Sequence, residues 1–111
     1  MTLSDLENEI LMEFRRAQAA REVGNEGKAR VCARRAAGMA VRRYLQERSI
    51  PVQGKSAFEL LRAFGNLPDI EEKMREAAGH LTRRVDEAFQ IPGEVDLVAE
   101  AEFLCEALHK L

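Results

Sequence analysis

The sequence predicts an all-α protein, an up-and-down antiparallel bundle of four long helices and one short helix. Apolar residues recur at steps of three and four along most of the 111 residues, which is the period of an amphipathic helix. No stretch requires a β-strand. The segments between the periodic stretches are only a few residues long, so consecutive helices are expected to be antiparallel neighbours. The length fits one domain, residues 1–111.

The first helix is expected to start at Ser4, because Ser4 and Glu7 have the spacing of a capping box. Its apolar stripe then predicts one buried face. The stripe consists of Leu3, Leu6, Ile10, Phe14 and Ala17. The stretch "GNEG" at 24–27 predicts a turn, since glycine tolerates positive φ.

The second helix is expected over residues 28–48. Small residues gather on one of its sides, so a neighbouring helix can approach closely. These residues are Ala29, Ala33, Ala36, Ala37 and Ala40, followed by Tyr44. Gly38 costs about 1 kcal/mol against alanine in a helix interior, and we therefore expect it to have a packing role.

Three further helices follow a loop, "SIPVQGK", at 49–55. Ser56 and Glu59 repeat the capping box and open a short helix, which Gly65 closes. A long helix is expected from about Pro68, with the stripe Ile70, Met74, Ala77, Leu81, Val85 and Ala88. The last helix carries Val95, Leu97, Val98, Ala101, Leu104, Cys105, Leu108 and Leu111.

Composition limits the classes of function. No apolar run approaches the roughly 18 residues that span a bilayer, and the start is acidic and amphipathic, unlike a signal peptide. Cys32 and Cys105 stand alone, which favours free thiols in a reducing compartment over a disulfide. We therefore expect a cytoplasmic protein with no membrane contact. The two cysteines and two histidines have no metal-ligand spacing, so neither a metal nor a cofactor is expected.

Charge is distributed unevenly along the chain. Residues 28–48 hold seven Lys and Arg against one acid, whereas residues 85–111 hold seven acids against one lysine. Two interpretations stay open for the basic segment. In one it is a phosphate-binding face that uses Arg35, Arg42, Arg43 and Lys55. In the other its charges are solvated and paired with nearby acids, including those of the last helix.

The order of helices resembles the HEPN domain, a small helical bundle, over nearly the whole chain. Three stretches of sequence carry the resemblance. "AAGMAVRRYL" at 36–45 matches the end of that family's second helix, with Gly38 in place of a glutamate. "GKSAFELL" at 54–61 follows the family's His-Ser-Leu region, with Lys55 in place of the histidine. "LTRRV" at 81–85 keeps the Thr-Arg of a Thr-Arg-Tyr-Pro motif and lacks the tyrosine and proline.

The resemblance implies a homodimer that acts as a non-catalytic nucleotide- or RNA-associated binding module, paired with a nucleotidyltransferase-like protein. Some members are metal-independent ribonucleases with an arginine four to six residues before a histidine. Arg75 and His80 have that spacing here, which gives an alternative function as a ribonuclease-like toxin of a toxin–antitoxin pair. The third alternative is a purely structural protein–protein interaction bundle whose apolar seam meets a partner helix.

Overall fold

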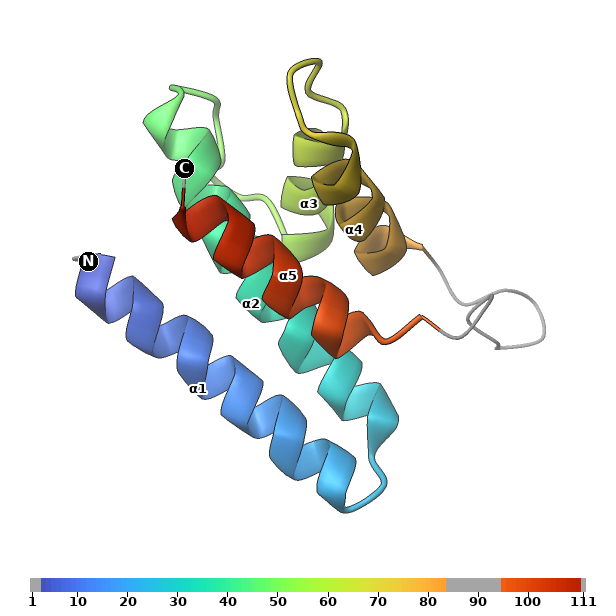
Figure 1. Cartoon of the computed structure of the whole chain (residues 1–111). Coiled ribbons are helices and arrows are strands. Elements are labelled where there is room, and N and C mark those ends of the chain that lie inside the picture. Colours follow the sequence, from blue (N-terminus) through green and yellow to red (C-terminus); the bar gives the residue numbers. More distant parts are fainter. Residues whose placement is uncertain (1–2, 84–94, 111) are drawn as a thin grey trace.

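In the computed structural model, residues 3–83 and 95–110 are described, and within these ranges the chain forms five α-helices and no strand. The helices are α1 (Leu3–Glu22), α2 (Glu26–Glu47), α3 (Ala57–Gly65), α4 (Glu72–Thr82) and α5 (Leu97–His109) (Figure 1). The all-α prediction is therefore confirmed over the described part of the chain. None of these helices is both long enough and apolar enough to cross a membrane.

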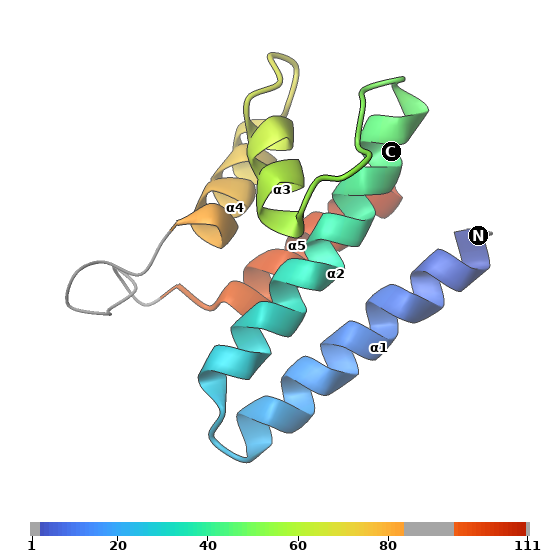
Figure 2. The same ribbon diagram turned by 180° about the vertical axis from the view of Figure 1, so that it is seen from behind.

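The helices α2, α3, α4 and α5 form a closed ring in which each packs against the next, and α5 returns to α2. The first helix lies outside this ring and packs mainly against α2, to which it runs antiparallel (Figures 1 and 2). The α3–α4 hairpin lies on the other side of α2 from α1 (Figure 2). Helix α2 is therefore the central element of the molecule.

The small-residue face of α2 is buried as expected. Ala29, Ala33, Ala36 and Ala37 have no exposed surface, and Tyr44 packs edge-on against Phe64 of α3 with 5.3 Å between ring centroids. Gly38 has the packing role that its position predicted. A Cβ atom there would lie 2.7 Å from Cβ and 3.0 Å from Cα of Ala57, so α2 and α3 touch through backbone at this point.

The prediction that α2 and α3 run antiparallel to each other is wrong. Residues 48–56 turn at Ser49, whose φ is +59°, and at Gly54, whose φ is +76°, and run back along α2. Lys55 consequently lies beside Arg42, and Ala57 beside Gly38, near the middle of α2. Helices α2 and α3 then point the same way (Figure 1). A connection of this length can reach back over about two helical turns, because each extended residue spans about 3.3 Å.

The predicted start of α3 is confirmed, whereas the predicted start and end of α4 are wrong. Ser56 caps α3 as its capping box predicts, since its hydroxyl accepts from the Glu59 amide at 3.1 Å. Helix α4 was expected to begin at Pro68, but that residue lies in a turn and the helix begins at Glu72. It also ends early, because Arg83 is extended. Val85 and Ala88, which were expected to continue its stripe, lie outside the described residues.

The outer helices differ from expectation only at their ends. Helix α1 begins at Leu3, one residue before the predicted cap, and the side chain of Ser4 lies outside the described residues. Helix α2 begins at Glu26, capped by Asn25, whose side chain accepts from the Lys28 amide. Asp96 caps α5 by accepting from the amides of Val98 and Ala99 at 3.0 and 3.2 Å.

Candidate functional site: a groove between α1 and α5

Most arginines of the basic segment contact the protein's own backbone. Arg34 Nε donates to the carbonyl of Leu81 at 2.6 Å, at the end of α4, and burial lowers the pKa of its guanidinium. Arg42 Nη2 donates to the carbonyl of Lys55 at 3.1 Å. Charged side chains commonly satisfy the free carbonyls of helix ends and turns in this way. Arg34 therefore ties α2 to the end of α4, and Arg42 ties α2 to the loop that precedes α3.

The four residues predicted to bind phosphate do not form one cluster. Arg42 and Lys55 are neighbours, and the exposed Arg35 lies two turns before Arg42 on the same face of α2. Arg43 faces elsewhere, because its guanidinium lies 3.5 Å from both Glu47 and the carbonyl of Leu108 in α5. The structure thus brings three of the four residues to one face and directs the fourth to α5.

Arg75 and His80 point to different helices. The Arg75 guanidinium donates to the carbonyls of Gly65, Leu67 and Ile70 at 2.6, 3.0 and 3.1 Å, which ties α4 to the end of α3. His80 Nδ1 lies 2.5 Å from a carboxylate oxygen of Glu100 in α5. The two side chains are each engaged with a separate neighbouring helix, and the structure does not bring them together around a common point.

A groove of about 670 Å³ opens between α1 and α5. Ile10, Leu11 and Phe14 of α1 form one wall and Cys105 is central to the other. The remaining lining residues are Glu7, Glu102, Glu106, His109 and Lys110. Leu11 is 47% exposed, a large value for a leucine in the middle of a helix. The groove is therefore an apolar surface that the monomer leaves uncovered.

The groove exists because α1 and α5 both rest on the alanine face of α2 and pack little against each other. A void of about 30 Å³ beneath the groove reaches Ala40 of α2. Cys105 Sγ lies 3.6 Å from the carbonyl of Ala36, also in α2. Burial, and then the charges of Glu102 and Glu106, raise the pKa of the Cys105 thiol to about 12, so this thiol is uncharged at neutral pH.

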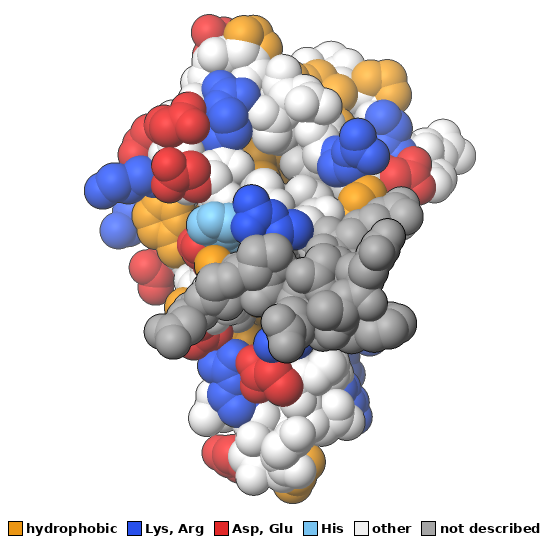
Figure 3. Space-filling model, turned by 90° about the vertical axis from the view of Figure 1, so that its right-hand side faces the viewer, with side chains coloured by type: hydrophobic (Ala, Val, Ile, Leu, Met, Phe, Trp, Pro, Cys, Tyr) orange, Lys and Arg blue, Asp and Glu red, His pale blue; other side chains and the backbone are white. Residues whose placement is uncertain are grey.

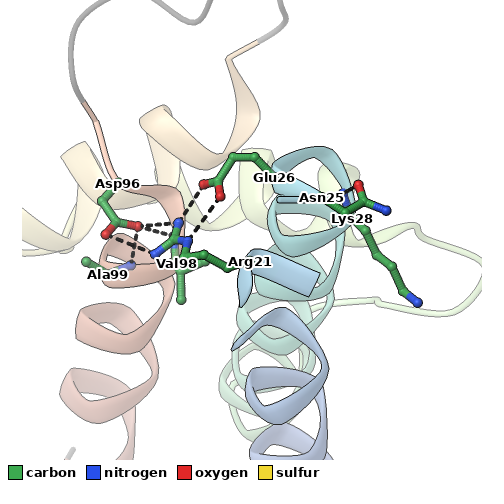
Figure 4. Close-up of polar contacts among 7 residues, drawn as sticks. All are labelled: Arg21, Asn25, Glu26, Lys28, Asp96, Val98 and Ala99. Carbon is green, nitrogen blue, oxygen red and sulfur yellow. Dashed lines mark hydrogen bonds and ion pairs between the residues drawn. The ribbon is translucent and has the colours of Figure 1, made fainter. Parts of the chain in front are cut away.

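Polar contacts join α1 to α5 near both ends of the helix pair: the Glu7–His109 contact lines the groove, and the Arg21–Asp96 pair lies about two helical turns beyond the lining residues. At one end Arg21 binds both oxygens of Asp96, at 3.0 and 3.2 Å, and also pairs with Glu26 at the start of α2 (Figure 4). These contacts lower the pKa values of Glu26 and Asp96 and raise that of Arg21. At the other end His109 Nδ1 lies 3.3 Å from Glu7. The ends of the two helices are thus held together while the apolar centre stays open.

Among the described residues, the two carboxylates on the α5 side of the groove have no ion-pair partner. Elsewhere on α5, Asp96 pairs with Arg21 and Glu100 with His80, but Glu102 and Glu106 have no ion pair or hydrogen-bond partner within residues 3–83 and 95–110. The acidic helix therefore does not neutralise the basic segment through ion pairs among the described residues. Another face of the molecule has cationic and acidic side chains interspersed (Figure 3).

Sequence reasoning did not find this groove. Leu11 was outside the expected stripe of the first helix, and the acidic pattern of the last helix predicted only a solvated face for Glu102 and Glu106. The signal available was the pair Leu11 and Met12, two large apolar residues beyond the stripe, which are 47% and 44% exposed. In the described part of the chain, no three His, Cys, Asp or Glu side chains gather in a way that could hold a metal ion.

Comparison of the chain with protein-family models, with curated proteins and with solved structures finds no match. The groove and the basic face are therefore the features of the molecule that bear on its function.

Proposed function

We propose that this chain is a protein-interaction module that binds an amphipathic helix of a partner in the α1–α5 groove. The observation that carries the proposal is the uncovered apolar wall of Ile10, Leu11 and Phe14 facing Cys105. Helix-in-groove recognition uses such surfaces, because the partner helix buries its apolar stripe between two helices that already exist. An exposed apolar area of this kind is a common mark of an interaction site.

The dimensions of the groove suit a helical ligand. Its lining residues run from Glu7 to Phe14 on α1 and from Glu102 to Lys110 on α5. At 1.5 Å per residue each wall is about 11–12 Å long, which is about two helical turns. A partner would therefore present anchors at positions i, i+3 or i+4, and i+7. It would rest on three helices, because Ala40 of α2 lies below the groove.

Selection of peptides tests the proposal. A display library of 15-residue helix-forming peptides is panned against the whole chain, and the enriched peptides are measured by fluorescence anisotropy. We expect Leu11→Glu to abolish their binding, because a carboxylate would be desolvated in the apolar wall. Val31→Glu is the matched control: Val31 is a helical apolar residue of similar exposure, 43%, that does not line the groove.

Both substitutions are at exposed positions and should leave the free energy of unfolding within about 0.5 kcal/mol of the wild type. Circular dichroism and urea denaturation check this. The proposal fails if no peptide is enriched, or if the enriched peptides bind the Leu11→Glu variant as well as they bind the wild type.

A second candidate function is nucleotide or RNA association, as the HEPN resemblance implies. The observation that favours it is the shared face of Arg35, Arg42 and Lys55. Under this candidate function a labelled single-stranded RNA binds with an affinity that falls steeply with salt, because counterions are released from phosphate. Replacing Arg35 by alanine should weaken that binding, whereas replacing the exposed Arg15 of α1 should not. Binding that is absent at low salt would exclude this function.

The homodimer, the nucleotidyltransferase-like partner and the ribonuclease alternative remain predictions from the resemblance. For the ribonuclease the geometry is unfavourable, since the Arg75 guanidinium already serves three backbone carbonyls. A function in cleavage would require that side chain to leave α3 and meet a phosphate together with His80. We therefore prefer the binding functions.

A further inference from the structure

Resting on the proposed function, we infer that the groove selects a cationic partner, an amphipathic helix whose apolar stripe is flanked by Lys or Arg on the side facing α5. The charges at the rim of the groove, and the contacts that each of them makes, define the chemistry of the partner more closely than the apolar wall alone.

The rim of the groove is predominantly acidic. Glu7, Glu102 and Glu106 line it together with one lysine, Lys110, and with His109. Glu7 already has His109 as a neighbour at 3.3 Å, so that carboxylate is partly matched within the monomer. Glu102 and Glu106 are one helical turn apart on α5 and have no partner within the described ranges. They form a short acidic edge beside the apolar wall.

Covering the groove changes the environment of these two carboxylates. A helix that buries the apolar wall removes water from the adjoining rim, and a carboxylate that loses water without gaining a cation is destabilised. Burial first, and then the charges of these two residues, raise the pKa of the neighbouring Cys105 thiol, and all three residues line the same side of the groove. A partner with Lys or Arg at positions i and i+4 would face both carboxylates at once.

A second copy of this chain does not fit the same requirement. If two grooves met face to face, the lining of each would bring Glu7, Glu102 and Glu106 against a single lysine into the same interface, and an excess of like charge at an interface costs affinity. If the basic face of α2 entered the groove of another copy instead, the contact would be heterologous and would lead to open chains of molecules rather than a closed dimer. A distinct cationic helix satisfies both the apolar wall and the acidic edge.

The test uses the peptides enriched on the wild-type chain. We expect them to carry net positive charge with Lys or Arg on one flank of the apolar stripe. For the tightest peptide, Glu102→Gln combined with Glu106→Gln should weaken binding about three- to tenfold at low salt, as expected for one or two exposed ion pairs. High salt should reduce the difference. Glu9→Gln combined with Glu76→Gln is the matched control, since both residues are exposed carboxylates outside the groove.

The outcomes separate this inference from the proposed function. Peptides that need Leu11 but carry no positive charge, or that bind the double glutamine variant unchanged, would overturn the cationic selection and leave the groove as a helix-binding site. Absence of any Leu11-dependent peptide would overturn both. Sedimentation equilibrium provides the remaining check: a dimer dissociated by Leu11→Glu and not by Val31→Glu would identify the occupant as a second copy and overturn the inference.

Discussion

Arg34, Arg43 and Arg75 each donate to a carbonyl near the C-terminus of a neighbouring helix. Arg34 reaches Leu81 in α4 at 2.6 Å, Arg43 reaches Leu108 in α5 at 3.5 Å, and Arg75 reaches Gly65 in α3 at 2.6 Å. The last carbonyls of a helix have no partner within it, and a cation also interacts favourably with the negative end of the helix dipole. A planar guanidinium can serve several such carbonyls at once, which lysine cannot do in the same geometry.

Arg75 is the residue at which this role can be measured. Replacing it by alanine removes three hydrogen bonds from a charged donor, at 2.6, 3.0 and 3.1 Å, to backbone that is partly buried. We expect a loss of about 2–4 kcal/mol in the free energy of unfolding, and a smaller loss for Arg75→Lys. Urea denaturation measures both. The ribonuclease alternative predicts the opposite pattern, in which the alanine variant keeps its stability and loses cleavage.

Glu13 is a second feature at the scale of single residues that the pattern of apolar residues does not reveal. It is only 4% exposed, and one of its oxygens lies 2.6 Å from Arg16. Its other oxygen is buried and has no hydrogen-bond partner within the described residues. Glu13 lies one helical turn before the buried Ala17, so it is on the buried face of α1. Glutamate is usually exposed in folded proteins. We find no structural reason for a carboxylate there.

At the scale of elements, the contact between α2 and α3 depends on Gly38. An added Cβ would meet Ala57 at 2.7 Å, and the atoms it meets include the Cα of that residue, so the two helices would have to separate. Because the added Cβ would meet backbone as well as side chain, we expect Gly38→Ala to cost about 2–3 kcal/mol through overpacking, which exceeds the gain of about 1 kcal/mol in helix propensity.

Gly79 provides the matched control for this substitution. It also lies inside a helix, but a Cβ there would meet nothing within 4 Å. Gly79→Ala should therefore raise the melting temperature through helix propensity alone, while Gly38→Ala lowers it. Thermal unfolding followed by circular dichroism compares the two variants directly. Shifts of the same sign would show that α2 and α3 are not in close backbone contact.

The elements could be predicted from the sequence where a local rule decides them. The Ser56 cap, the buried alanine face and the need for Gly38 all follow from periodicity and from the cost of glycine in a helix. The end of α4 could not be predicted in this way. The stripe predicted through Val85 and Ala88 gave no reason to stop at Thr82, yet Arg34, 47 residues before Leu81, donates to that carbonyl at the helix end. Contacts between residues so distant in sequence have no periodic signature.

The path of residues 48–56 and the groove were missed for a related reason. The length of a loop indicates how far apart two helices can be, but not whether the loop turns outward or runs back along the helix that precedes it. That direction places Lys55 beside Arg42 and closes the ring from α2 to α5 without α1. The groove depends on the packing of three helices: α1 and α5 both pack on α2, and they pack little against each other.

At the scale of the whole molecule, Arg21 connects three helices. It lies in the last turn of α1 and pairs with Glu26 in the first turn of α2 and with Asp96, the cap of α5 (Figure 4). The side chains are 31–50% exposed, so solvent screens these pairs and each contributes little by itself. Their importance lies in geometry, since Arg21 joins the last turn of α1 to the starts of α2 and α5.

Acid titration tests this connection. Hydrogen bonds from Arg21 are the main cause that lowers the pKa values of Glu26 and Asp96 below their ordinary values of 4.5 and 3.8. The folded chain therefore holds fewer protons than the unfolded chain in that range, so the stabilisation is complete above about pH 5 and is lost as the pH falls through the lowered values. We expect Arg21→Ala to reduce the free energy of unfolding at pH 7 by about 1 kcal/mol and to flatten its decline below pH 5.

Urea denaturation of the wild type and of the Arg21→Ala variant between pH 7 and pH 3 measures this difference, with Arg15→Ala as a control because that exposed arginine also lies on α1. The free energies of unfolding of the wild type and of the Arg21→Ala variant should converge as the pH falls, because protonation removes from the wild type the contacts that the substitution has already removed. A difference in free energy that stays constant down to pH 3 would mean that Arg21 does not pair with these carboxylates in solution. In that case α1 would be held to the ring by its packing on α2 and by the Glu7–His109 contact with α5, without the contribution of Arg21.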